Sequence, residues 1–200
     1  MDIRARLTLI ICGSFLWAGL QGNAAAAPVL QIDPNGILTG ALGVNVSGTL
    51  YNVSFVDGSC NSVFNGCSDG SFTFSTALDA AAASLAILND ILIDRPGHLF
   101  DTIPDLTRGC TFPGQCLIFT PSFILGGTSF VQASGVLNSF NNAIDRVGVN
   151  NIPSTLDFLP DTKRTWAVWS VPQTVPLPPA FPLLVGGFGL LLRRGRKRTQ

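Results

Sequence analysis

The stretch "VNVSGTLYNVSFVDG", residues 44–58, carries the clearest structural pattern in this chain. Apolar and polar residues alternate along two short runs, 44–47 and 49–56, so the apolar side chains of each run share one face. Alternation with a period of two is typical of a strand that is buried on one side. Gly48 between the runs predicts a hairpin, and Asp57-Gly58 predicts the end of its second strand.

Short apolar runs elsewhere in the chain predict further strands. One covers residues 29–32 and ends at the turn sequence Asp33-Pro34-Asn35-Gly36. The segment 129–144 combines helical spacing with Gly135 and several Ser and Asn residues, and we interpret it as a strand followed by a short helix. Other runs of strand length lie at 117–120, 122–125 and 165–171.

One long helix is predicted for residues 77–92. Thr76 is a suitable N-cap, and the alanines at 80–83 favour helix. Apolar residues recur at spacings of three and four, which predicts a core-facing side formed by Leu78, Ala81, Leu85, Leu88 and Leu92. Pro96-Gly97 ends the helix. Together with the strands, this predicts an α+β fold in which an antiparallel sheet carries one principal helix.

Charge is distributed unevenly along the chain. The 200 residues contain 12 basic and 12 acidic side chains, but residues 27–174 contain only 5 basic and 11 acidic ones, a net charge of about −6. This acidic balance argues against a nucleic-acid-binding surface, which requires clustered positive charge. The chain has a single histidine, which excludes a metal site built from several histidines.

The first 26 residues have the pattern of a secretory signal peptide. Arg4 and Arg6 precede an apolar run at 7–20, and the small residues at 24–26 suit cleavage by signal peptidase. We expect the cut after Ala26, which leaves residues 27–171 as the exported domain, here called the body. The alternative is an uncleaved N-terminal anchor.

Three further elements follow the body. A Pro-rich linker at 172–178 contains the motif Val175, Pro176, Leu177 and Pro178. An apolar segment at 179–192 is predicted to span the membrane, although it is short for a hydrocarbon core of about 30 Å. The tail at 193–200 contains the basic residues Arg193, Arg194, Arg196, Lys197 and Arg198. Basic residues stay in the cytoplasm, so the body is expected outside the inner membrane.

This arrangement resembles the PEP-CTERM sorting signal in its VPLPA-type variant, from which it departs by the extra Pro179 before Ala180. The resemblance implies recognition by an exosortase-type enzyme, removal of the tail, and a final location at the cell surface or outside the cell, in Gram-negative bacteria that often make exopolysaccharide. The body is also similar to uncharacterised ectodomains of such proteins, through "GTLYNVSFVDGSC" and "WAVW". The alternative is a plain C-terminal anchor.

Four of the five cysteines lie in the body, at Cys60, Cys67, Cys110 and Cys116. An even number of cysteines in an exported chain predicts disulfides. Three connectivities are possible, and pairing of near neighbours, Cys60 with Cys67 and Cys110 with Cys116, is favoured because short loops cost little closure entropy. A four-cysteine zinc site is the alternative, but its ligands usually have two to four intervening residues.

No catalytic constellation is apparent in the body. A hydrolase would have to use His98, the only imidazole, and the chain has no Gly-x-Ser-x-Gly motif to supply a nucleophile. Asp33-x-Asn35-Gly36 lacks the later ligands of a calcium loop. We therefore expect no catalytic residues, no cofactor and no metal.

These observations predict an exported protein of the cell envelope or extracellular matrix that is not an enzyme. One alternative is a module that binds exopolysaccharide through a row of exposed aromatic side chains, for which Tyr51, Trp166 and Trp169 are the candidates. The two tryptophans are three residues apart in a predicted strand, which places them on opposite faces. Further alternatives are an anchored periplasmic protein and a secreted hydrolase centred on His98.

Overall fold

The computed structural model describes residues 27–172 of the chain. The predicted signal peptide, sorting motif, apolar segment and basic tail therefore lie outside the described residues, and the description below concerns the body.

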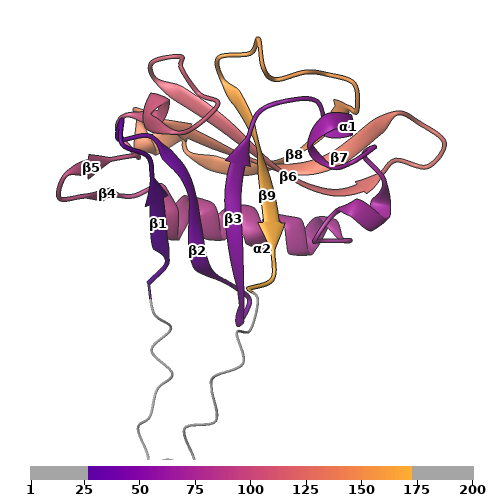
Figure 1. The fold of residues 1–200 in the computed structure, drawn as a ribbon, viewed down its shortest axis with the longest axis horizontal. Helices are drawn as coiled ribbons and strands as arrows, with labels where there is room; N and C mark the ends of the chain where they lie inside the picture. Colours follow the sequence, from indigo (N-terminus) through magenta and orange to yellow (C-terminus); the bar gives the residue numbers. More distant parts are fainter. Residues whose placement is uncertain (1–26, 173–200) are drawn as a thin grey trace, which may run out of the picture.

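The body is built on a seven-stranded sheet with the order β1-β2-β3-β9-β6-β7-β8 (Figure 1). Its strands are β1 (Val29–Ile32), β2 (Leu38–Val46), β3 (Thr49–Val56), β6 (Gln115–Ile124), β7 (Phe130–Ser139), β8 (Arg146–Pro153) and β9 (Arg164–Ser170). The predicted hairpin is confirmed, because β2 and β3 pair antiparallel and Val46 faces Thr49 across the turn. Ser47 and Gly48 in that turn both have positive φ, as a tight hairpin requires.

The sheet is mixed, so the prediction of an antiparallel sheet is wrong in one place. Strands β1–β3 and β6–β8 form two antiparallel meanders, and β9 lies between them. The last strand pairs antiparallel with β3 but parallel with β6. The parallel pair follows from the position of β9 between β3 and β6, which run in opposite directions. A strand between two such neighbours is antiparallel to one of them and parallel to the other.

Shorter elements connect these strands. A second, two-stranded ribbon consists of β4 (Asp94–Arg95) and β5 (His98–Leu99). The single-turn helices are α1 (Cys60–Val63), η2 (Asp69–Ser71), η4 (Pro104–Leu106) and η5 (Asn142–Ile144). The segment 129–144 thus contains a strand and a short helix, as predicted, with the strand reaching Ser139.

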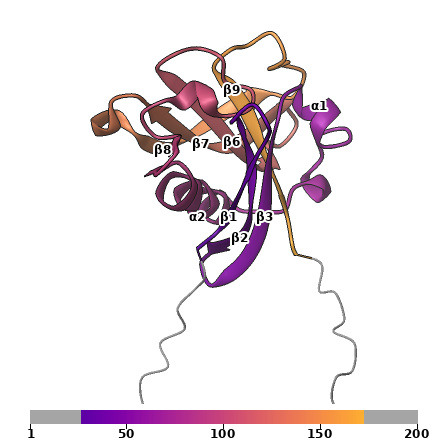
Figure 2. The same cartoon turned by 60° about the vertical axis from the view of Figure 1, so that its left-hand side comes forward.

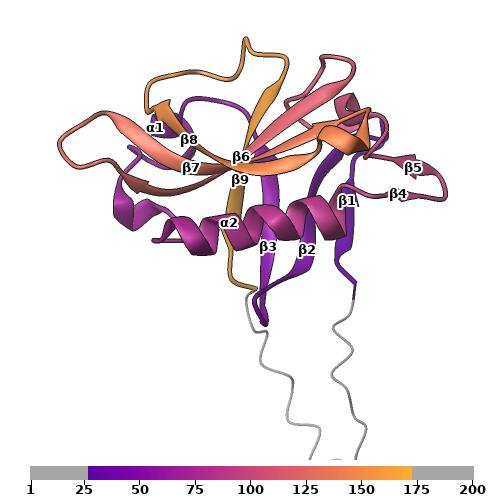
Figure 3. The same ribbon diagram turned by 180° about the vertical axis from the view of Figure 1, so that it is seen from behind.

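The principal helix, α2 (Ala77–Ala86), continues into the π-helical turn η3 (Ile87–Ile91), which confirms the predicted extent of the helix. Its N-cap is also as predicted, because the Thr76 hydroxyl accepts a hydrogen bond of 3.1 Å from the backbone N–H of Asp79. Figure 3 shows this helix lying across the strands on one face of the sheet.

The predicted core-facing side of this helix is wrong in part: Leu92 is buried and Leu88 packs against the core, but the predicted side chains nearer the start of the helix are not buried. Leu78 is 79% exposed and Leu85 is 49% exposed. The buried side is formed instead by Ala80, Ala83, Ser84, Ala86, Ile87 and Ile91. Small side chains allow the helix axis to approach the sheet, and the Ser84 hydroxyl donates a hydrogen bond of 3.1 Å to the Ser134 carbonyl of β7. With Ala80, Ala83 and Ser84 turned to the sheet, Leu78 and Leu85 lie on the outer side of the helix.

The sheet has a hydrophobic core on each face. The first lies between α2 and the sheet, and its members include Phe55, Phe74, Phe100, Trp169, Ile87 and Ile91. The second lies on the opposite face, beneath α1 and the 154–163 loop, and is rich in aromatic rings: Phe64, Phe72, Phe119, Phe158 and Trp166. Figure 2 shows α1 and α2 on opposite sides of the sheet.

Candidate functional site

Both cysteine pairs are at disulfide distance, which confirms the local pairing among the described residues. The Cα atoms of Cys60 and Cys67 are 5.3 Å apart, and those of Cys110 and Cys116 are 5.5 Å apart. The first bridge begins at α1 and closes the loop that covers the second core, while Cys110 and Cys116 are both buried in the first core. Each core thus has one bridge at its margin.

His98 lies in the β4–β5 ribbon and packs against an aromatic ring. Its imidazole stacks on Phe100, with the ring centroids 5.4 Å apart and the planes 5° from parallel. The Asp94 side chain, which lies in the same ribbon, accepts hydrogen bonds from the Asp101 N–H (3.0 Å) and the Thr102 hydroxyl (2.9 Å). The hydrolase alternative requires a nucleophile and an acid to converge on His98, and residues 27–172 do not show that arrangement.

Asp33 acts as a turn residue in the structure. Its Oδ1 accepts hydrogen bonds from the backbone N–H groups of Asn35 (2.8 Å) and Ile37 (3.0 Å), so the carboxylate closes its own loop. Elsewhere in the part of the chain that the structure describes, no group of three or more His, Cys, Asp or Glu side chains is arranged to hold a metal ion.

The three aromatic candidates do not form an exposed row. Trp166 is fully buried and Trp169 is 6% exposed, on opposite faces of β9 as predicted. Tyr51 is partly buried and packs against Phe74 and the edge of Trp169. The exposed row that the exopolysaccharide alternative requires is therefore not formed by these residues, because their rings pack in the two cores.

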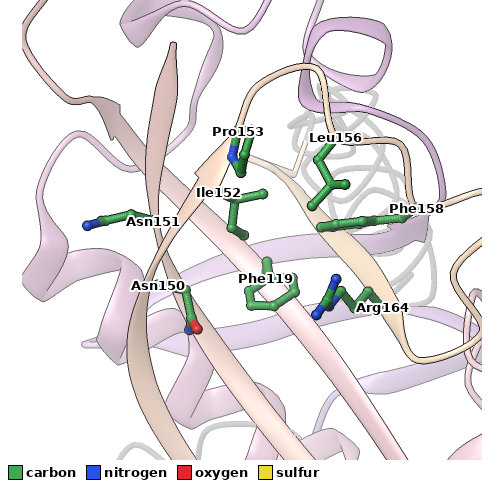
Figure 4. A pocket seen from close by; sticks show the side chains of 8 residues that line it. All are labelled: Phe119, Asn150, Asn151, Ile152, Pro153, Leu156, Phe158 and Arg164. Carbon is green, nitrogen blue, oxygen red and sulfur yellow. The ribbon is translucent and has the colours of Figure 1, made fainter. Parts of the chain in front are cut away.

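A cavity of about 160 Å³ lies on the face of the sheet opposite α2 (Figure 4). It is bounded by β6, the edge strand β8, the loop before β9 and the first residue of β9. Its lining residues are Phe119, Asn150, Asn151, Ile152, Pro153, Leu156, Phe158 and Arg164. We call it the Phe119 cavity.

Two polar side chains stand at the margin of an apolar floor in the Phe119 cavity. Phe119 and Phe158 form the floor, with ring centroids 5.6 Å apart. Asn150 and Arg164 flank them, whereas the side chain of Asn151 points away (Figure 4). Arg164 supplies the only charge among the lining residues and forms an ion pair of 3.0 Å with Asp161.

Gly135 in β7 creates the room for this arrangement. A Cβ atom at this position would lie 2.6 Å from the Asn150 Nδ2 atom and 2.9 Å from Cε1 of Phe119. Those distances are shorter than real contacts permit, so a larger residue would displace the amide and the ring together. The missing side chain of Gly135 therefore allows Asn150 and Phe119 to lie over the centre of β7.

A second hollow of about 250 Å³ lies beside the β2–β3 turn, on the face that α2 covers. Its lining is mostly hydroxyl-bearing and comprises Val46, Ser47, Thr49, Tyr51, Thr73, Phe74, Ser75 and Asp79. Two of the polar side chains already form hydrogen bonds within the protein. The Thr73 hydroxyl donates to the Trp169 carbonyl (2.6 Å), and the Asp79 carboxylate accepts from the Thr76 hydroxyl (2.7 Å). The hollow is broad and polar, without the apolar floor of the Phe119 cavity.

Two carboxyl groups of the body have perturbed acidity. Burial, together with the neighbouring carboxyl of Asp101, raises the pKa of Asp145 to about 6, against the lowering effect of a hydrogen bond from the Ser139 N–H (2.7 Å). Burial also raises the pKa of Asp57, whose carboxylate lies close to Thr165 at the start of β9. Neither group lines the Phe119 cavity, so these shifts belong to the packing of the body.

Sequence reasoning did not find the Phe119 cavity. Its main contributors, Phe119, Asn150 and Arg164, belong to three separate strands and form no local motif. The one available signal was Gly135, because a glycine inside a strand often marks a place where other groups approach the backbone closely.

Comparison with known protein families, with curated proteins and with solved structures gave no match for this chain. Within residues 27–172 we find no helix that is both long enough and apolar enough to cross a membrane. The predicted sorting residues, Val175–Pro178 and the basic cluster after residue 192, lie outside the described part.

Proposed function

We propose that this chain is an exported protein of the cell envelope or extracellular matrix, without enzymatic activity, that is sorted through its C-terminal segment. The observation that carries the proposal is the pairing of all four cysteines of the body at disulfide distance. Disulfides of this kind are typical of oxidising compartments outside the cytoplasm. The secretory pattern of residues 1–26 supplies the route to such a compartment.

The C-terminal residues supply the sorting step of this proposal. The apolar segment 179–192 holds the precursor in the inner membrane, and the basic residues from Arg193 to Arg198 keep the end of the chain in the cytoplasm. The motif Val175–Pro178 lies just before the apolar segment, where an exosortase-type enzyme in the membrane can reach it. Cleavage there separates the body from its anchor.

The test is the double substitution Pro176→Ala and Pro178→Ala in a host that contains an exosortase. Insertion does not depend on these prolines, because the apolar segment and the charges are unchanged. We expect the variant to accumulate at full length in the inner membrane, as measured by intact mass and membrane fractionation. Pro172→Ala, in the same linker but outside the motif, serves as the matched control and is processed normally.

Processing of the double variant at the wild-type rate would contradict the sorting role, and the C-terminal segment would then be a plain anchor.

A second variant tests membrane insertion separately from recognition by the processing enzyme. Replacing Arg193, Arg194, Arg196, Lys197 and Arg198 with neutral residues weakens the barrier to passage of the tail, since each charge resists entry into the bilayer by roughly a few kcal/mol. We expect this variant to leave the membrane fraction with its C-terminus still attached.

A second candidate function is the binding of an acidic sugar of an exopolysaccharide, and the Phe119 cavity favours it. A cavity of about 150 Å³ accommodates a molecule of the size of benzene, so a volume of about 160 Å³ suits the carboxylate-bearing part of one sugar residue and not a whole uronate. Arg164 and Asn150 at its margin suit a carboxylate and hydroxyl groups. Phe119 and Phe158 are 3% and 0% exposed, so the binding rests on these polar side chains and not on stacking against the rings.

This candidate is tested with uronate-containing oligosaccharides by titration calorimetry. We expect Arg164→Met to abolish binding, because it removes the only cation of the cavity. Arg146→Met is the matched control, since Arg146 is an exposed cation of β8 that does not line the cavity. Equal affinity of the two variants, or no binding by the wild-type protein, would exclude a sugar site here.

A further inference from the structure

Both described ends of the chain leave the body at the same end of the sheet. Strand β1 starts there and β9 finishes there, beside the turn that joins β2 and β3 (Figures 1 and 3). By strand register, Val29 at the start of β1 pairs with Leu42 in the middle of β2, and Ser170 at the end of β9 pairs with Asn52 in the first half of β3. The β2–β3 turn therefore extends beyond both chain ends. A membrane segment placed soon after β9 would therefore hold this end of the body towards the bilayer.

This end of the sheet carries no charge on its strands. Strands β1, β2 and β3 contain no charged residue, and the single charged residue of β9, Arg164, stands at the opposite end of that strand. Asp33 and Asp57 follow the far ends of β1 and β3. Asp79 is near this end but lines the hollow on the α2 face. Asp69 accepts a hydrogen bond from the Ile124 N–H at the end of β6, which runs parallel to β9, so the missing charge is a property of strands β1, β2, β3 and β9 at this end.

Exposed aliphatic side chains gather where the charges are missing. Val29 is 61% exposed, its strand neighbour Leu42 is 42% exposed, and Leu50 of β3 is 48% exposed. The adjacent residues Leu30 and Tyr51 pack against the core under α2, so alternation turns Val29 and Leu50 to the other face. Val171, directly after β9, is 64% exposed. We call Val29, Leu42, Leu50 and Val171 the uncharged apolar end.

We propose that the uncharged apolar end rests on the outer leaflet of the membrane that holds the precursor. The inference depends on the proposed function, which places the apolar segment in that membrane. The ten steps of chain from Val171 to Phe181 can span at most about 36 Å, so the body stays within that distance of the bilayer. No charged residue occurs between Arg164 and Arg193, so the sequence is neutral from the last strand to the predicted membrane segment.

Electrostatics favours the same orientation. A body with a net charge of about −6 is repelled by anionic lipid headgroups, and the repulsion decreases over about a Debye length. Turning the uncharged apolar end to the membrane keeps most acidic side chains at a distance and brings aliphatic groups to the interface.

The experiment places a fluorescent reporter on this surface. The mature chain from Ala27 to Gln200 is reconstituted into vesicles of brominated phosphatidylcholine, which quench tryptophan only at short range. Leu50→Trp puts the reporter in the uncharged apolar end. Leu159→Trp is the matched control, because Leu159 is 71% exposed in the loop before β9, at the opposite end of the sheet. Trp166 and Trp169 contribute an equal background to both variants.

We expect brominated lipid to reduce the fluorescence of Leu50→Trp and to leave that of Leu159→Trp at its value in non-brominated vesicles. Val29→Trp provides an independent position if Leu50→Trp does not fold. Flotation of the vesicles is measured in parallel. If the protein floats with the vesicles but both tryptophan reporters are quenched equally, the uncharged apolar end does not rest on the membrane, although the anchor is still supported. Absence of the protein from the floated vesicles would overturn both this inference and the anchoring step of the proposed function.

Discussion

Trp166 and Trp169 lie three residues apart in β9 and are buried on opposite faces of one sheet. The Trp166 indole stacks on Phe158, with centroids 4.9 Å apart, and its Nε1–H donates to the Gly58 carbonyl at 2.9 Å. The Trp169 Nε1–H donates to the Thr120 hydroxyl at 3.1 Å. One strand therefore supplies the largest side chain of each core, and both indole N–H groups are satisfied, as buried indoles require.

The buried side of α2 is tested by a pair of substitutions. Ile87→Ala should destabilise the body by roughly 2–5 kcal/mol, because Ile87 is fully buried between the helix and the sheet. Leu85→Ala should cost less than about 1 kcal/mol, since that side chain is half exposed. Free energies of unfolding from urea denaturation compare the two. A larger loss for Leu85→Ala would mean that the leucine side of the helix is the buried one.

The disulfides give a second prediction. The folded body should contain no free thiol, so a thiol reagent added to unfolded, unreduced protein should label none of its four cysteines. Replacing Cys60 and Cys67 with Ser should lower the free energy of unfolding by about 2 kcal/mol, the loop-entropy value for a closed loop of this length. Labelling of two or more cysteines in the wild-type protein would contradict the pairing.

Gly109, which packs against the Asp57 side chain in the fold, is predicted to be intolerant of substitution. Gly109 has a φ of +89°, and a Cβ atom there would lie 2.6 Å from Cβ of Thr165 and in collision with the Asp57 carboxylate. Gly109→Ala should therefore cost about 2 kcal/mol or more, from backbone strain and overpacking together. Gly148→Ala is the control, because nothing lies within 4 Å of a Cβ atom at that position. Thermal unfolding that shows equal shifts for both variants would exclude this steric account.

The raised pKa of Asp145 predicts a pH dependence of stability. The folded protein holds the Asp145 proton up to a pH of about 6, whereas the unfolded chain releases it near 4. Protonation therefore favours the fold at low pH, and this contribution is lost as the pH rises through about 6.

Asp145→Asn removes this titration while keeping an oxygen that accepts from the Ser139 N–H. The variant should be more stable than the wild-type protein at pH 7, and the difference should shrink as the pH falls towards 4. Melting temperatures of both proteins across this range provide the measurement. A difference that stays constant with pH would show that the carboxyl has an ordinary pKa in the fold.

The sequence predicted those parts of the fold that depend on local chemistry. The alternation around Gly48 specified the central hairpin, Thr76 specified the start of α2, and the short intervals between cysteines favoured the pairing that the structure has. Each of these signals is complete within about ten residues, so no knowledge of the tertiary structure was needed.

The missed features depend on contacts between distant segments. The rotation of α2 could not be read from its sequence, because both sides of "ALDAAAASLA" are apolar and the buried side is the one on which Ser84 meets the Ser134 carbonyl. The direction of β9 relative to β6 depends on where the last strand enters the sheet. The Phe119 cavity needs Gly135 to be placed against Asn150, which no local pattern indicates.

The central position of β9 also determines the order in which this protein can assemble. The ribosome makes β9 last, yet the sheet has the strand in its middle, flanked by β3 and β6. Until β9 emerges, the two meanders each present an unpaired inner edge, and Trp166 and Trp169 have not yet reached either core. Cooperative closure of the sheet therefore waits for the last strand in the chain, and the two meanders cannot join into one sheet before β9 is available.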